Sequence, residues 1–441
     1  MAHQTEAACL LDAGALYGTR LLLKPREGDP IFAGFKSGAF SLYYGDAPIF
    51  HFDLEGRWQR VYVHGRHYLK GLDSTIQAID REREGKHLTL HRRTLGFVEG
   101  GELDDLIRAT ALDLLAELAS GRFEAIDPPP KARALSIDEL VGFLERISSW
   151  NAAAWFSHRE RFLATYRGHL PLLPPDCTAP VVLQATCGSE TGSVFGGAVD
   201  PTPFESRTVE EFESHAKSVA RLLGRRVAQC KQIVLAGADV LRRPTGDVAG
   251  YLQAALREFP AELGSTPRQP DKSDDARARL DGVHAFLDRL DDPGKNAVDW
   301  RTLATHGLVR VTLGIESGDP DVRAAYGKTW NSDDLIRLVQ NLKAASIGVG
   351  VLLLVGAGGV ARDDEAHAAA TADLVNALPL GAGDLVSLLD AHELSQGRNA
   401  AEPVSGERYA ARLDDLRMRL APLRERQAKV APYLLSKQGV L

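Results

Sequence analysis

A chain of 441 residues is too long for one ordinary hydrophobic core, so its length predicts two domains unless a large α/β barrel is present. Its 44% hydrophobic and 25% charged residues are typical of globular proteins, and its net charge of −7 comes without a basic block, which argues against nucleic acid or an anionic membrane as a partner. We recognise no signal peptide and no apolar run of about 20 residues, so we expect a cytoplasmic protein.

The first structural signal is an alternating pattern from Asp29 to Asp73. Short aromatic and β-branched runs are separated by Lys36-Ser37-Gly38, Gly45-Asp46 and Glu55-Gly56, which predicts an antiparallel meander with tight hairpins. Such a sheet buries one face, so we expect the core to include some of its aromatic residues. These are Phe32, Phe35, Phe40, Tyr43, Phe50, Phe52, Trp58 and Tyr62.

The histidines of this region do not predict a metal site. His64 and His67 are three residues apart on a strand, so their side chains face opposite sides. His51 and Asp53 share a face but lack a third ligand, and we expect a hydrogen-bonded pair on a wet surface.

Helices and a linker follow the meander. Helical spacing from Glu102 to Leu118 and a capping box formed by Ser136 and Glu139 predict two helices, separated by the stiff prolines of 128–130. We therefore predict an N-terminal α+β domain over 1–127, a helical linker over 128–175 and a second domain over 176–441.

The second domain reads as alternating strands and helices. The predicted strands are Val181–Thr186, Lys231–Gly237, Gly282–Leu287, Val309–Ile315, Val349–Val355 and Asp384–Asp390. These apolar runs are typical of parallel strands buried on both faces, and they predict a parallel α/β sheet or an incomplete (β/α) barrel. The polar segment 261–279 reads as a mobile insertion. Asn331 predicts the start of a helix between the fourth and fifth strands.

Several motifs of this domain resemble those of the radical S-adenosylmethionine (SAM) superfamily. The runs GLVRVTLGIESGD, ending at Asp319, and IVLAGADVLRRPT, ending at Thr245, are similar to its strand-four and strand-two runs, and Lys328 stands before the next helix. His367 and Thr371 match a His-x-x-x-Thr of one subgroup, and APYLLSK resembles its closing segment. The resemblance implies a partial (β/α)6 TIM-like barrel, preceded here by the small antiparallel sheet and helices.

The motif that carries the chemistry of this superfamily is missing. Its enzymes hold a [4Fe-4S] cluster by C-x-x-x-C-x-x-C on the loop after strand one, and Ser189, Ser193 and Gly196 stand at those three positions. A serine hydroxyl stays protonated near neutral pH and glycine has no donor, so we predict that the [4Fe-4S] cluster is absent and assign no catalytic residue and no metal ligand. The four cysteines, Cys9, Cys177, Cys187 and Cys230, are scattered, and we read them as free thiols.

The positions that would contact SAM are better preserved, which leaves SAM as the cofactor that the resemblance implies. They are Gly237, Ala238, Asp239, Glu316, Ser317, Val355, Gly356 and Gly358. By resemblance, Asp239 would pair with the methionyl ammonium and Glu316 and Ser317 would meet ribose and carboxylate. We expect an open cavity at the carboxyl ends of the strands, lined by Ser189, Asp239, Glu316 and Gly358.

Three functions stay open at this stage. The first is a pseudoenzyme, a radical-SAM-like protein without the cluster that binds an unknown small molecule or a protein. The second is an active enzyme with an unorthodox cluster or a cluster-free use of SAM. The third is a binding module centred on the N-terminal sheet, with the barrel as its scaffold.

Overall fold

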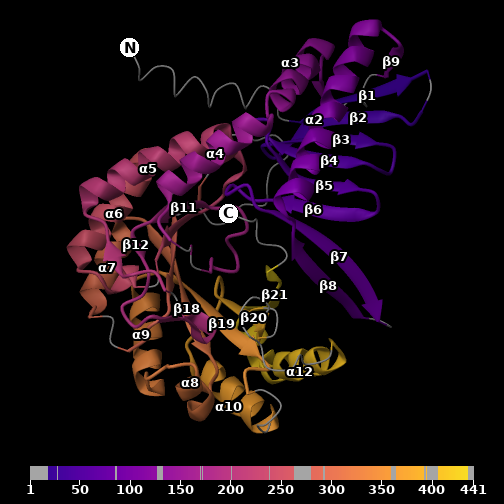
Figure 1. Cartoon of the computed structure of the whole chain (residues 1–441). Helices are drawn as coiled ribbons and strands as arrows, with labels where there is room; N and C mark the ends of the chain where they lie inside the picture. Colours follow the sequence, from indigo (N-terminus) through magenta and orange to yellow (C-terminus); the bar gives the residue numbers. More distant parts are fainter. Residues whose placement is uncertain are drawn as a thin grey trace.

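The computed structural model describes residues 18–26, 28–84, 87–126, 133–168, 170, 172–199, 201–237, 239–262, 280–291, 294–358, 364–391, 394 and 406–435. These residues form two large β-sheets with helices packed against each (Figure 1). Cys9, Ala238, the proposed boundary after residue 127 and residues 263–279 of the predicted insertion lie outside the described residues. No helix within the described ranges is long and apolar enough to cross a membrane.

The N-terminal sheet is a meander that is longer than predicted. Its strands are β1 Thr19–Pro25, β2 Ile31–Lys36, β3 Ala39–Tyr44, β4 Ile49–Asp53, β5 Trp58–Val63, β6 Arg66–Lys70, β7 Ile76–Glu84, β8 His87–Thr94, β9 Phe123–Ile126 and β10 Arg133–Ala134. Strands β1 to β8 pair in chain order and antiparallel, while β9 and β10 both pair with β1. The prediction ended the sheet at Asp73, but β7 and β8 continue it as a long hairpin that reaches the helix α12, Gly406–Arg419 (Figure 1).

One face of this sheet is the core of the N-terminal part. Helices α2, Phe97–Ser120, and α3, Ile137–Ser148, cover it, and the alternation of the strands places Phe40 and Phe52 against them. The ring of Phe143 in α3 lies 4.6 Å from that of Phe40. Because α3 shares this core, the N-terminal core continues past residue 127 into the segment read as a linker.

His51 and Asp53, the two residues of β4 for which we expected a hydrogen-bonded pair, lie on the other face of the sheet. Nδ1 of His51 is hydrogen-bonded to Ser41 Oγ at 2.9 Å, and the carboxylate of Asp53 is fully buried against Arg57. The expected pair of His51 and Asp53 is therefore wrong. Each side chain has a different partner, Ser41 on the neighbouring strand β3 for His51 and Arg57, four residues further along the chain, for Asp53.

The second sheet has seven parallel strands in chain order, one more than predicted. They are β11 Val181–Gln184, β16 Ile233–Ala236, β17 Val283–Leu287, β18 Leu308–Glu316, β19 Gly348–Val355, β20 Leu385–Asp390 and β21 Lys429–Tyr433. Strands β11 and β21 are its two edges, so the sheet is open. The chain leaves it after Gln184, and β12 Thr186–Cys187 instead pairs antiparallel with β15 Glu205–Ser206.

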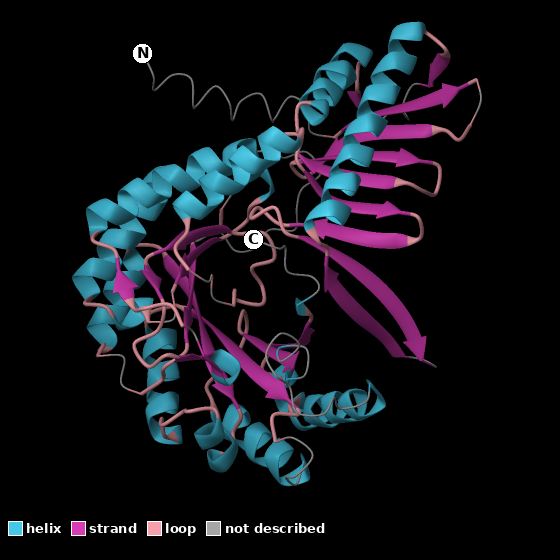
Figure 2. Ribbon diagram, in the orientation of Figure 1, coloured by secondary structure: helices cyan, strands magenta, loops and turns pink. Residues whose placement is uncertain are grey.

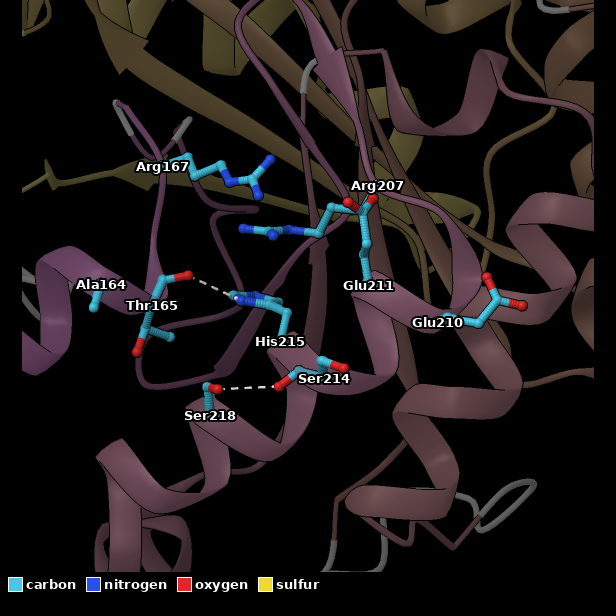
Figure 3. A pocket seen from close by; sticks show the side chains of 9 residues that line it. All are labelled: Ala164, Thr165, Arg167, Arg207, Glu210, Glu211, Ser214, His215 and Ser218. Atoms are coloured by element: carbon cyan, nitrogen blue, oxygen red, sulfur yellow. Dashed lines mark hydrogen bonds between the residues drawn. The ribbon is translucent and has the colours of Figure 1, made fainter.

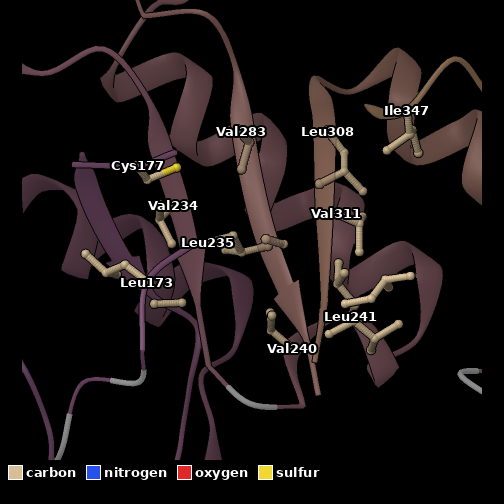
Figure 4. Close-up of a cluster of buried hydrophobic side chains, with 14 of the residues drawn as sticks. Leu173, Cys177, Val234, Leu235, Val240, Leu241, Val283, Leu308, Val311 and Ile347 are labelled. Carbon is tan, nitrogen blue, oxygen red and sulfur yellow. The ribbon is translucent and has the colours of Figure 1, made fainter. Parts of the chain in front are cut away.

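Helices line the outer side of this curved sheet (Figure 2). They are α4 Ala152–Thr165, α5 Val209–Leu223, α6 Thr245–Glu258, α7 Ala297–Thr305, α8 Pro320–Ala325, α9 Ser332–Ala344, α10 Asp364–Ala377, α12 and α13 Ala421–Glu425. The apolar strand residues and these helices form one buried cluster, part of which is drawn in Figure 4. All residues of β11, β16 and β17 are buried, as parallel strands covered on both faces require.

The two sheets are joined through the end of α5. The guanidinium of Arg57 donates to the carbonyls of Leu222 and Leu223 at 2.7 and 2.6 Å, and its Nε donates to Asp53 at 2.7 Å. Nearby, Gln59 and Gln229 are hydrogen-bonded at 2.9 Å. The N-terminal sheet therefore contacts the parallel sheet near the amino end of β16, away from the carboxyl ends of the strands.

Candidate functional site

A buried ion cluster lies at the carboxyl ends of β17 and β18. Nζ of Lys328, between α8 and α9, lies 2.6 Å from Asp288 Oδ1 and 3.1 Å from Glu316 Oε1. Lys328 also donates to the Asp288 carbonyl at 3.0 Å. All three side chains are at most 6% exposed. Two carboxyl groups thus share one ammonium inside the protein.

The backbone at Glu316 turns its side chain into this cluster. Glu316 has a φ of 56°, a left-handed conformation uncommon for a residue other than glycine, and the register of β18 against β19 shifts between Gly314 and Glu316. Glu316 Oε1 accepts a hydrogen bond from the Gly196 amide at 3.0 Å, whereas its buried Oε2 has no partner. Strained backbone of this kind persists where the surrounding contacts fix it and is concentrated at functional sites.

Burial sets the protonation of the cluster. It raises the pKa of Glu316 to about 8, and the charge of Lys328 offsets only part of the rise. Burial likewise raises the pKa of Asp288. For Lys328, burial lowers the pKa, but the nearby Glu316 and Asp288 carboxyls raise it by more, so the Lys328 pKa stays above its ordinary value. Near pH 7 we therefore expect an ion pair of Lys328 with Asp288 and a neutral Glu316 whose proton lies on Oε2.

We expect Glu316→Gln to stabilise the protein as the pH rises. A pKa raised from 4.5 to about 8 means that the folded chain keeps a proton that the unfolded chain loses, so this stabilising contribution is complete below pH 4.5 and declines up to pH 8. Urea unfolding should give the variant a free energy of unfolding within about 1 kcal/mol of the parent at pH 4.5, and roughly 2–4 kcal/mol above it at pH 8. A variant that is less stable than the parent at pH 8 would mean that Glu316 is ionised in the fold.

The loop that carries the predicted cluster positions is folded onto the strand ends. Ser189 Oγ donates to Asp239 Oδ2 at 3.2 Å, and the Glu190 amide donates to the same oxygen at 3.1 Å. At the other end of the loop, Gly196 is held by Glu316. Ser193 belongs to the short strand β13 Ser193–Val194 between them. Two of the three predicted positions are thus tied to predicted SAM-contacting residues.

The same loop directs Phe195 into the interior of the sheet. Its ring lies edge-on to Phe286 at 5.8 Å, and it is 5% exposed. These two residues form an apolar cluster with Leu352, Leu354, Leu389 and Tyr433. Phe195 and Phe286 therefore fill part of the space at the strand ends where we expected an open cavity, next to Gly314 and Asp288, because the loop turns its one aromatic side chain inward.

The two motifs that follow β18 and β19 meet in space. Ser317 Oγ is hydrogen-bonded to His367 Nδ1 at 2.9 Å, and the Gly318 amide donates to Thr371 Oγ1 at 2.9 Å. A Cβ atom at Gly318 would lie 2.4 Å from the Cα of Thr371, so only glycine lets α10 approach this closely. The predicted Ser317 is thus fully buried in a contact between the strand end and α10.

The remaining predicted SAM positions lie in two places. Gly237 and Asp239 follow β16, and the buried Asp239 Oδ1 has no hydrogen-bond partner. Val355 and Gly356 line a pocket of about 350 Å³ between the end of β19, α10 and α12. His367, Glu365, Arg412, Asp415 and Arg419 also line it. Gly358 lies in the turn that follows β19.

A second pocket, of about 390 Å³, was not predicted. It lies between the end of α4 and the start of α5, and its polar lining includes Arg167, Arg207 and His215 (Figure 3). Burial, followed by the charge of Arg207, lowers the pKa of His215 to about 3, so the ring is neutral. Its Nε2 accepts from the Gln184 amide, and its Nδ1 therefore donates to the Thr165 carbonyl. Because both ring nitrogens bond to the backbone, His215 has a structural role in this pocket. Arg167 forms an ion pair with Glu205.

Asp288 was not among the predicted site residues, and Lys328 was predicted only as part of the resemblance. A signal for Asp288 was present: it follows a buried strand directly, as Glu316 ends one. Acidic residues at the carboxyl ends of neighbouring parallel strands lie at one edge of the sheet.

Comparisons with known proteins give only distant likenesses. No family model and no curated protein matches the chain. Among solved structures, it is similar to the radical SAM methyltransferase TsrM from Kitasatospora setae, with 14% identity and a TM-score of 0.36 over 60% of this chain and 57% of that chain. It is also similar to the cobalamin-dependent S-adenosylmethionine radical enzyme OxsB, with 13% identity and a TM-score of 0.34 over 68% of this chain and 35% of that chain.

A third likeness is to Elp3 of the archaeon Methanocaldococcus infernus, with 12% identity and a TM-score of 0.36 over 59% of this chain and 62% of that chain. The chain thus spans between about a third and two thirds of the length of these structures. TsrM and OxsB are described as radical SAM enzymes, the superfamily that the sequence motifs resemble. At this level of likeness we draw no argument from them about function.

Proposed function

We propose that this chain is a radical-SAM-like protein, with a partial (β/α) barrel, that holds no [4Fe-4S] cluster and acts by binding a small molecule or a protein partner. The observation that carries the proposal is the loop Gly188–Gly196, which has no thiol at Ser189, Ser193 and Gly196. Serine and glycine do not replace thiolate ligands of iron. The hydrogen bonds of Ser189 and Gly196 to Asp239 and Glu316 give this loop a structural role instead.

The geometry of the loop does not fit a cluster ligand at position 196. Gly196 has a φ of 78°, and a Cβ atom there would lie 2.1 Å from Leu394 Cδ2. A side chain at this position would therefore be strained and would have to displace Leu394.

The cysteines of the described residues do not offer an alternative set. Cys187 lies on β12, Cys230 precedes β16 at the amino end of that strand, and Cys177 precedes β11. These three thiols lie on separate segments, whereas the superfamily takes its three from one loop.

The chemistry of the ligand follows from two buried oxygens without partners. Asp239 Oδ1 is a carboxylate oxygen that fits an ammonium or another donor, and Glu316 Oε2, when protonated, fits an acceptor. Both a donor and an acceptor occur in the amino-acid end of SAM, which supports SAM or a ligand of similar chemistry as a candidate. Because burying a polar group without a partner is unfavourable, a ligand that satisfies these two atoms gains affinity.

The first test is reconstitution. We expect the purified chain, incubated anaerobically with iron and sulfide and then desalted, to retain no stoichiometric iron and to release no 5′-deoxyadenosine from SAM under reducing conditions. The physical reason is the lack of three converging thiolates. Iron and sulfide assays, visible absorbance and chromatography of the reaction give the answer, and a cysteine-bearing radical SAM enzyme treated in parallel shows that the procedure works.

Stoichiometric cluster and 5′-deoxyadenosine from the unmodified chain would refute the proposal and support an active enzyme. The ligand is tested separately by equilibrium dialysis with labelled SAM. If Asp239 holds an ammonium, Asp239→Asn should weaken binding by roughly tenfold or more, because a charged hydrogen bond is lost. Glu213→Gln, on the surface of α5 and away from the strand ends, serves as the control.

A further inference from the structure

A group of potential metal ligands lies at the opposite, amino-terminal end of the parallel strands. Asp176 and Cys177 lie in the short segment that leads into β11, and His284 is the second residue of β17. One ligand atom from each of these three residues lies within 4.8 Å of the other two. Cys177 is fully buried and His284 is 4% exposed, while Asp176 is partly open to solvent.

The ring of His284 is oriented as in metal-binding histidines. Its Nε2 lies 3.3 Å from Asp281 Oδ1, an oxygen that accepts, so Nε2 carries a hydrogen and Nδ1 is the ring nitrogen left for a metal ion. Nδ1 is buried without a hydrogen-bond partner and lies 3.6 Å from Asp176 Oδ2. A carboxylate that accepts from one ring nitrogen and leaves the other to the metal is the usual arrangement around ligating histidines.

The thiol of Cys177 completes the group. Its Sγ lies 3.9 Å from Asp176 Oδ1, and Figure 4 shows the sulfur beside the buried strands. A tetrahedral zinc ion, with bonds of about 2.0–2.3 Å, separates its ligand atoms by roughly 3.3–3.8 Å. Cys177 Sγ and Asp176 Oδ1 are 3.9 Å apart, and one ligand atom from each of the three residues lies within 4.8 Å of the others, so movements of roughly 1 Å bring the three ligand atoms to such an ion.

The charges around the group also suit a divalent cation. Arg310 Nε lies 3.1 Å from Asp176 Oδ2, and Asp281 faces the far side of the ring. With Cys177 as a thiolate, the charges of Cys177, Asp176 and Asp281 exceed that of Arg310 by two negative units, which a divalent ion neutralises. Burial, then the charge of Asp176, raises the pKa of Cys177 well above its ordinary value, so metal binding would displace a proton.

We propose that the Asp176 carboxylate, Cys177 Sγ and His284 Nδ1 bind a divalent transition metal ion, with zinc the best fit to this oxygen, sulfur and nitrogen set. The fourth position is left to water on the side where Asp176 meets solvent. Because the site lies at the amino-terminal end of the strands, where residues of such sheets serve stability, its role is to fix the segment before β11 onto β17. The inference does not depend on the proposed function, since it uses no residue of the carboxyl-end cluster.

The test uses the full chain, stripped with a chelator and dialysed against zinc or cobalt(II) with a reductant present. We expect one zinc ion per chain by elemental analysis and, with cobalt, a thiolate-to-metal charge-transfer band in the near ultraviolet. Cys177→Ser should abolish this band and weaken zinc binding at least about tenfold, and His284→Gln should weaken zinc binding to a similar degree. Cys230→Ser removes another buried thiol and should change neither.

Two results would overturn the proposal. One is a chain that retains no zinc after dialysis at micromolar free metal, and the other is a cobalt band that survives in Cys177→Ser. Should the variants fail to fold, X-ray absorption of the zinc-loaded parent decides, because this site requires one sulfur at about 2.3 Å with only nitrogen and oxygen otherwise. Zinc bound without a sulfur neighbour would refute it.

Discussion

Replacing Arg57 with methionine should lower the free energy of unfolding by roughly 3–5 kcal/mol. Arg57 is 3% exposed, and its guanidinium holds the carboxylate of Asp53 together with the last carbonyls of α5 at Leu222 and Leu223. Without it, the fully buried carboxylate of Asp53 loses the cation bonded to it, and the last carbonyls of α5 lose two hydrogen bonds from a positive group, which is favourable at the carboxyl end of a helix. Urea unfolding at pH 7 measures the loss.

Two variants show whether the loss comes from this arrangement. Arg60→Met, on the same strand but exposed, should stay within about 0.5 kcal/mol of the parent. Adding Asp53→Asn to Arg57→Met should recover part of the stability, because the unpaired charge is gone. If Arg57→Met and Arg60→Met are equally mild, Arg57 does not hold the two sheets together as inferred.

Features governed by local sequence could be predicted. The predicted capping box of α3 is present, with the Glu139 amide donating to Ser136 Oγ. Asn331 caps α9 through the Asp334 amide. In each case the two interacting residues are three positions apart, so both partners can be recognised in the local sequence.

Features governed by distant pairing could not be predicted. Strands β7 and β8 are rich in charged residues and lack the aromatic alternation of the earlier strands, so only their pairing identifies them. The edge strand β21 contains Pro432, and a proline within a run argues against a strand unless the strand is at an edge. Whether a run becomes an edge strand depends on the rest of the sheet.

The candidate site was predicted in part for the same reason. Glu316, Ser317 and His367 were selected through family resemblance, and the structure brings the last two into contact. Asp288 was not predicted because a single aspartate after a strand is common, and only its contact with a buried cation distinguishes it. Lys328 supplies that cation from 40 positions away, a distance along the chain over which spacing carries no information.

Replacing Lys328 with methionine should be as costly as the change at Arg57, and its cost should depend on pH. At pH 8 the variant leaves Asp288 and Glu316 buried without a cation, and removing one partner of a buried ion pair costs roughly 3–5 kcal/mol. Urea unfolding of parent and variant at pH 5 and pH 8 gives the difference in free energy of unfolding at each pH.

The loss of stability caused by Lys328→Met should be smaller at pH 5 than at pH 8. Without Lys328, only the weaker effect of Arg289 opposes the rise that burial causes in the pKa of Asp288, so the folded variant takes up a proton that the unfolded chain binds only at lower pH. The folded state then binds more protons than the unfolded state, and the stability of the variant rises as the pH falls. Lys343→Met is the matched control, because Asp384 keeps the amides of Val349 and Gly381 as donors and Lys343 is partly exposed. A cost for Lys328→Met that is small and the same at both pH values would mean that Lys328 does not compensate a buried charge of Asp288 in the parent, and the ion pair described here would be wrong.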